Sequence, residues 1–193
     1  MSPGRVLPLA ESPRDKLGDV ERDHIEAAIR SAFAGVQLGS GISLRQTQVI
    51  SDYGRGYTRA EFEALPESEV TDDWAQIPDD ELAQDFIVAH LDADGLRYYL
   101  PALMLWLLHH YDDEDRVISG ADMTSIFTMA ALAPDPRFEE SYRGKYDSFS
   151  ADQRAAVASY VEALPRLVEL DDRDAAAVAR SIDHLWAPFL PRP

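Results

Sequence analysis

Apolar residues recur at helical spacing in several stretches of the chain and predict an all-α protein. The two clearest stripes are Ile25, Ile29, Ala32 and Phe33, and later Val178, Ile182, Leu185, Trp186 and Phe189. Asp19 and Asp171 precede these stripes where a helix N-cap is needed. We therefore predict a helix over about residues 20–34 and a last helix that begins after Asp171.

Three capping boxes predict further helix starts, because a Ser or Thr is followed three residues later by Gln or Glu. The pairs are Ser43 with Gln46, Thr58 with Glu61, and Ser150 with Gln153. The expected helix ends are Gly54, Pro66 and Pro165, since glycine and proline commonly terminate helices. In the first of these helices, Val49, Ile50 and Tyr53 are expected to face inward.

The longest apolar run, Tyr98 to Leu108, predicts the central helix of the protein. Its 11 residues are too few for a membrane span, which needs about 20. Proline suits the first turn of a helix, so we expect a helical turn over 92–99 and a new helix over about 101–111 that begins with Pro101. A helix that is apolar on nearly all sides should be covered by the others.

The remaining segments are less regular. Pro78 and the acids that follow it predict a helix reaching about His90. A further helix is expected near Asp122 to Leu132, followed by a segment interrupted by proline and glycine. Together these elements predict a compact multi-helix domain over residues 19–193, preceded by a disordered arm over residues 1–18.

Composition adds limits on compartment and chemistry. The chain has no cysteine, which excludes disulfides, thiolate metal sites and a cysteine nucleophile. The N-terminal stretch lacks the continuous apolar core of a signal peptide, so we expect a cytoplasmic protein.

Charge is distributed unevenly along the chain. The net charge is −17, and residues 61–115 contain 16 Asp or Glu against one base, Arg97. Such a field repels nucleic acid and anionic membranes and attracts cationic groups. A basic protein is therefore the expected partner, and neither nucleic acid nor a membrane is expected.

No complete catalytic or cofactor-binding motif is present. His109 and His110 precede Asp112 and Asp113, but adjacent residues on a helix point about 100° apart and do not share one ion easily. The phosphate-binding glycine patterns and the serine-nucleophile pattern G-x-S-x-G are also absent. We therefore expect no metal and no cofactor.

Arg97 remains as the single base of the acidic region. One interpretation is that it pairs with Asp73 and fixes how two helices meet. The other is that Asp73, Trp74, Arg97 and Tyr98 line a cleft for a ligand or a partner. With Asp112 and Asp113, these six residues form the predicted binding set.

Four segments resemble an uncharacterised bacterial family known only as a domain of unknown function. They are GSGISLRQ at Gly39–Gln46, AEFEALP at Ala60–Pro66, DDW at Asp72–Trp74 and RYYLPALM at Arg97–Met104. The resemblance covers about residues 25–190 and implies a small cytoplasmic bacterial protein, without assigning catalytic residues.

Two functional hypotheses follow from the sequence. The first is an acidic interaction module of the antitoxin, immunity or nucleic-acid-mimic type, because an acidic region stands without catalytic motifs. The alternative is a small-molecule or metal-dependent enzyme or sensor with a cleft near Asp73, Arg97 and His109.

Overall fold

The computed structural model describes residues 13–84, 86–113 and 121–191, and every regular element in these ranges is helical, as predicted. The longer helices are α1 (Pro13–Ala32), α5 (Ala93–His110), α6 (Ala121–Leu132), α8 (Ala151–Leu167) and α9 (Asp172–Ser181). Shorter helices are α2 (Leu44–Ser51), α3 (Arg59–Ala64), α4 (Asp79–Leu82) and α7 (Glu139–Tyr146). Single 3-10 turns are η1 (Leu65–Ser68), η2 (Trp74–Gln76), η3 (Val88–His90) and η5 (Ala187–Phe189), and η4 (Ile182–Trp186) is a π-helical turn.

Helix α5 occupies the centre of the fold, as predicted for the apolar run, and 13 of its 18 residues are buried. It differs from the prediction in being one continuous helix that contains Pro101. The Asp92 side chain caps it by accepting from the Gly95 amide at 2.8 Å. A proline in a helix removes one backbone hydrogen bond, and burial on nearly all sides holds this helix together across that gap.

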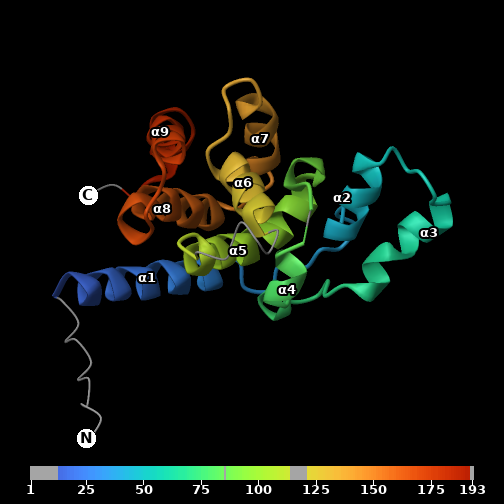
Figure 1. Cartoon of the computed structure of the whole chain (residues 1–193), viewed down its shortest axis with the longest axis horizontal. Helices are drawn as coiled ribbons and strands as arrows, with labels where there is room; N and C mark the ends of the chain where they lie inside the picture. Colours follow the sequence, from blue (N-terminus) through green and yellow to red (C-terminus); the bar gives the residue numbers. More distant parts are fainter. Residues whose placement is uncertain (1–12, 85, 114–120, 192–193) are drawn as a thin grey trace, which may run out of the picture.

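Apart from α2 and α3, the other helices pack around α5 in two groups (Figure 1). Helix α1 packs along α8, and α9 with η4 continues this group. Helices α6 and α7 pack directly on α5, as do α4 and η2. Ile25 and Ile29 of α1 and Phe33 directly after it are buried, which confirms the stripe predicted from the sequence.

Side chains close several helix ends by donating to carbonyl groups that lack a partner within their own helix. The Arg22 guanidinium donates to the carbonyl oxygens of Leu108 and Leu167, at 2.7 and 3.0 Å, and so joins the ends of α5 and α8 to α1. Tyr146 and Trp186 do the same for the end of α6, donating to the carbonyls of Ala131 and Leu132.

Several predicted boundaries are wrong for identifiable reasons. Helix α1 begins at Pro13, so Asp19 lies inside the helix and does not cap it. Proline is favoured in the first turn of a helix, which is consistent with the earlier start. Residues 13–18 of the predicted arm are thus helical, and residues 1–12 lie outside the described residues. Helix α4 ends at Leu82, well before His90.

Two further differences concern the C-terminal half. Helix α8 starts with the predicted Ser150 cap but continues past Pro165 to Leu167, where Leu164 and Leu167 are buried and hold the last turn. Helix α7 lies in the segment expected to be irregular. Its Tyr142 and Tyr146 pack into the core, which outweighs a weak helical pattern.

The backbone approaches itself most closely where the loop before α2 crosses the start of α5. A Cβ atom on Gly95 would lie 2.4 Å from the Ile42 carbonyl oxygen, and one on Gly41 would lie 2.6 Å from the Gly95 nitrogen. The Ile42 amide also donates to Asp92 at 3.0 Å. This contact of two glycines fixes the position from which α2 leaves the body.

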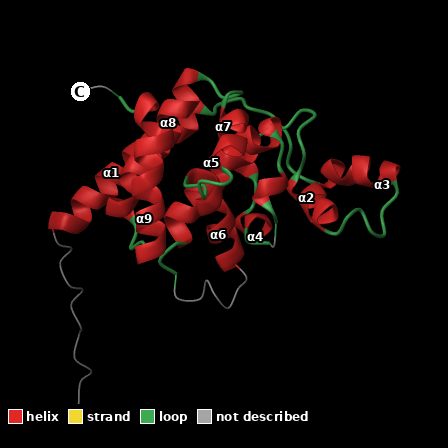
Figure 2. Ribbon diagram, turned by 90° about the horizontal axis from the view of Figure 1, so that it is seen from above, coloured by secondary structure: helices red, strands yellow, loops and turns green. Residues whose placement is uncertain are grey.

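Residues 44–68 (α2, α3 and η1), here called the α2–α3 arm, lie at one end of the molecule's long axis (Figure 1) and stay apart from α1, α8 and α9 in the perpendicular view as well (Figure 2). Helix α3 contains no buried residue. The arm is therefore anchored mainly through α2, whose Leu44, Thr47 and Val49 are buried. Among the described helices, none has both the length and the apolar character required to cross a bilayer.

Candidate functional site

Two of the six predicted binding residues are part of the core. Trp74 is 4% exposed and its indole nitrogen donates to the Phe33 carbonyl at 2.8 Å. Tyr98 is fully buried as a residue, and its hydroxyl donates to the Val70 carbonyl at 2.8 Å. Both side chains fix the segment before α4 against the body, and their contacts are with the chain itself.

The predicted pairing of Arg97 with Asp73 is wrong. Arg97 forms an ion pair within α5, with Asp94 at 3.0 Å, because residues three apart are neighbours on a helix surface. Asp73 instead accepts from the Ala75 amide at 3.1 Å and caps η2, leaving its carboxylate exposed.

Asp112 and Asp113 lie beyond the other end of α5. Asp112 accepts from the Glu169 amide at 3.0 Å, and Asp113 lies 2.7 Å from Nδ1 of His110. His109 contacts Glu26 at 3.1 Å. These acids and histidines are distributed over separate contacts, and the described residues contain no group of three or more that could hold a metal ion.

The cleft predicted near Asp73, Arg97 and His109 does not form as one site. Arg97 and His109 are twelve residues apart on α5, which corresponds to about 18 Å along the helix axis. A hollow of about 250 Å³ includes Trp74, Trp106 and His109 in its lining, without Asp73 or Arg97. Because both tryptophans are only 4% exposed, the hollow offers little aromatic surface to a ligand.

Carboxylates gather near the Tyr98 hydroxyl, which itself donates to the Val70 carbonyl. We call Glu69, Asp72, Asp73 and Glu81, together with Asp80 beside Glu81, the acidic face. Burial raises the pKa of Tyr98, and the charges of Asp72, Asp73, Glu69 and Glu81 raise it further. Glu69 is held in place by two donors, the hydroxyls of Ser43 and Tyr99. Segments separated in sequence therefore bring their charges to one region.

The acidic face contains little compensating positive charge. Burial raises the pKa of Glu81, with further contributions from Glu69 and Asp80 that the Arg45 charge opposes. None of the acidic-face residues forms an ion pair with another described residue, although Arg166–Glu21, Arg143–Glu139 and Arg59–Glu63 pairs occur elsewhere. The face is thus a concentration of negative charge, in which Asp72, Asp73 and Asp80 are exposed while Glu69 and Glu81 are partly buried.

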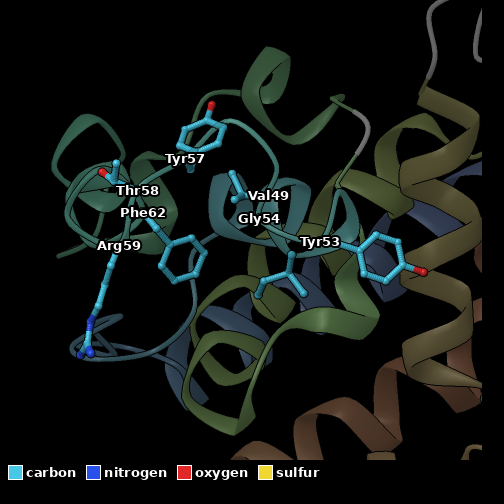
Figure 3. Close-up of a pocket in the computed structure, with 8 residues that line it drawn as sticks. Val49, Tyr53, Gly54, Tyr57, Thr58, Arg59 and Phe62 are labelled. Atoms are coloured by element: carbon cyan, nitrogen blue, oxygen red, sulfur yellow. The ribbon is translucent and has the colours of Figure 1, made fainter.

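A second candidate surface is an apolar groove on the α2–α3 arm, with a volume of about 380 Å³. In Figure 3, Val49 from α2 and Phe62 from α3 face each other across it. Its lining is completed by Ile50, Tyr53, Gly54, Tyr57, Thr58 and Arg59. Tyr57 also lines a neighbouring hollow of about 320 Å³. Apolar concavities bordered by tyrosine and arginine are typical of surfaces that bind other molecules.

Tyr53 departs from its predicted inward position, because it is 90% exposed and its ring points away from Val49 and Phe62 (Figure 3). Its backbone has φ of 56°, a left-handed conformation that is uncommon outside glycine. This conformation follows the end of α2 and turns the side chain out of the helical stripe. The helical spacing at Tyr53 could not reveal the turn, although the glycine at position 54 indicated a helix end nearby.

Comparison with known proteins adds one finding. A family model described as a family of unknown function (DUF6714) matches residues 21–190. No curated protein matches the chain, and no solved structure matches it.

Proposed function

The chain belongs to DUF6714, a family of unknown function, and from its surface we propose that it is an interaction module whose acidic face binds a basic protein partner. The observation that carries this proposal is the gathering of Glu69, Asp72, Asp73 and Glu81 near Tyr98, where the Tyr98 hydroxyl bonds the Val70 carbonyl and the Tyr99 hydroxyl bonds Glu69. Like charges held close together repel one another, and a cationic partner relieves that repulsion.

Contacts between residues support the proposal further. Glu69 is oriented by Ser43 and Tyr99, and Asp73 by the Ala75 amide, so their carboxylates are held in place before a partner arrives. Preorganised charges increase both the rate and the specificity of association. Lysine and arginine side chains are the groups that such a face would bind.

The proposed partner is a protein, because the same negative charge opposes the phosphates of nucleic acids and of anionic lipids. The proposed setting is the cytoplasm, where a fold without cysteine needs no oxidising environment. A small-molecule enzyme has less support, since Arg97 and His109 do not meet in one cleft.

The proposal can be tested by affinity capture from host lysate at low and high salt, followed by binding of the purified candidate partner. The variant Asp72→Asn/Asp73→Asn/Glu81→Gln removes three charges from the acidic face while asparagine preserves the η2 cap. The matched control, Glu140→Gln/Glu162→Gln/Asp183→Asn, removes three exposed charges from α7, α8 and η4.

We expect one basic protein to bind at low salt and to be released at high salt, because salt screens exposed charges. The acidic-face variant should weaken this binding on the order of tenfold or more, and the control variant should retain most of it. Binding that does not change with salt concentration would contradict an acidic-face interaction. So would binding that the acidic-face variant and the control variant weaken equally.

A further inference from the structure

We propose that the α2–α3 arm is a self-association surface, in which the apolar groove of one copy receives the Tyr53 side chain of a second copy. The arm carries both a cavity and a projecting side chain. A two-fold axis between two arms would place each Tyr53 in the groove of the other copy, as in an isologous contact.

The groove provides the receiving half of this contact. Its volume of about 380 Å³ exceeds what one side chain needs, and Val49, Ile50 and Phe62 supply apolar walls. Val49 is buried, while Ile50 and Phe62 are only partly buried. Covering these walls removes apolar surface from water, at about 25 cal/mol per Å².

Tyr53 provides the projecting half. It is 90% exposed, and among the described residues its side chain has no hydrogen-bond, ionic or ring contact. Its left-handed backbone closes the end of α2, where the Tyr53 and Gly54 amides donate to the carbonyls of Ile50 and Val49 at 3.0 and 2.8 Å. This backbone arrangement directs the side chain outward, although glycine would adopt it at lower cost. A tyrosine held outward in this way is suited to anchor a contact, because its ring buries a large area at low entropic cost.

The local charge of the arm, unlike that of the whole chain, favours a second copy as the occupant. The whole chain has a net charge of −17, but the arm has three arginines against four acids and is nearly neutral. Arg55 and Glu67 are exposed and have no described ionic partner, so opposite charges are present on the same surface. Two arms can therefore approach without the repulsion that two acidic faces would experience.

The size of the arm predicts a weak dimer. Stable interfaces typically use about 20–30 residues from each side, and the arm contains 25 residues in all. Only part of them can face a second copy at once. We therefore expect a dissociation constant in the micromolar range, on the order of 10–100 µM.

Salt separates this contact from the proposed binding of a basic partner. Salt screens the repulsion between two chains of charge −17 and leaves an apolar contact largely intact, so the dimer should strengthen as salt rises. Binding at the acidic face should weaken under the same change. Failure of one proposal is thus distinguishable from failure of the other.

The experiment is sedimentation velocity on the full chain from about 5 to about 500 µM, at about 0.1 and about 0.5 M NaCl. Tyr53→Gly removes the projecting side chain without removing any packing, and Phe62→Ala enlarges and flattens the groove. Phe138→Ala is the control, because Phe138 is 57% exposed and lies outside the arm. Circular dichroism of each variant checks that the helices remain folded.

A concentration-dependent dimer, stronger at high salt and weakened at least about tenfold by Tyr53→Gly and Phe62→Ala but not by Phe138→Ala, supports the proposal. A chain that stays monomeric at every protein and salt concentration overturns the proposal, and the occupant of the groove would then be a different protein. A dimer that Tyr53→Gly leaves unchanged, or that Phe138→Ala weakens equally, also overturns it.

Discussion

At the scale of single residues, Tyr53 combines a left-handed backbone with a side chain that contacts almost nothing, and this combination predicts a gain in stability on replacement. In Tyr53→Gly the steric cost of positive φ disappears, while no packing is lost. The arm should become more stable by about 0.5–1 kcal/mol, so amides of α2 should exchange hydrogen a few times more slowly. Exchange that is unchanged or faster would show that the Tyr53 side chain stabilises the arm despite its exposure.

Gly95 is the opposite case, because the position has no room for any side chain. In Gly95→Ala the new Cβ would lie 2.4 Å from the Ile42 carbonyl oxygen, and the neighbouring backbone must move. We expect a loss of about 2 kcal/mol or more in the free energy of unfolding, measured by urea denaturation.

Gly144→Ala is the control for that measurement. Gly144 lies in α7 with no atom near the added Cβ, so alanine should raise stability by about 0.5–1 kcal/mol through its helix propensity. Two glycine-to-alanine changes in one chain should therefore have opposite signs. Equal effects would contradict the close backbone approach at Gly95.

At the scale of elements, the starts of helices could be predicted well because capping is local chemistry. The caps Ser43, Thr58, Ser150 and Asp171 all accept from the expected backbone amides. Helix interiors and ends were harder to predict, since Pro101 and Pro165 lie within helices that tertiary packing maintains. Local propensity decides where a helix can begin, and burial decides how far it continues.

The candidate surfaces could be predicted only in part, for the same physical reason. The concentration of negative charge was evident from the sequence, and Asp73 is exposed on the acidic face. The burial of Trp74 and Tyr98 depends on Phe33 and Val70, which are distant in sequence. The groove of the α2–α3 arm depends on how two short helices meet, which no helical spacing encodes.

Arg22 gives an element-scale prediction, because its guanidinium joins the ends of two helices to a third. Arg22→Ala leaves the Leu108 and Leu167 carbonyls without these donors and should lower the free energy of unfolding by about 2 kcal/mol. Thermal or urea denaturation measures the loss. Arg30→Ala, an exposed residue of the same helix that forms no ion pair with another described residue, should change stability by less than about 0.5 kcal/mol.

At the scale of the whole molecule, the acidic face should make stability rise as the pH falls moderately. Burial and the charges of Glu69 and Asp80 raise the pKa of Glu81. A carboxyl group whose pKa is raised by folding destabilises the folded state above that raised value and has no effect below its unfolded value of about 4.3. The melting temperature should therefore increase as the pH falls from 7 through the raised pKa of Glu81 toward the unfolded value.

Glu81→Gln tests this interpretation directly. The variant should melt at a higher temperature than the native chain at pH 7, and the difference should shrink as Glu81 of the native chain becomes protonated. Glu169→Gln, at an exposed position after α8, should have little effect at either pH. A Glu81→Gln variant that is less stable at pH 7 would show that Arg45 outweighs the surrounding acids.

The anchoring of the α2–α3 arm through α2, with no buried residue on α3, has a consequence for how this family can diverge. Substitutions on α3 remove no core packing, so most of them should cost little stability. Recognition can then change along a lineage while the helices around α5 stay the same. If the proposed contact on the arm is correct, the arm separates the evolution of binding specificity from the preservation of the fold.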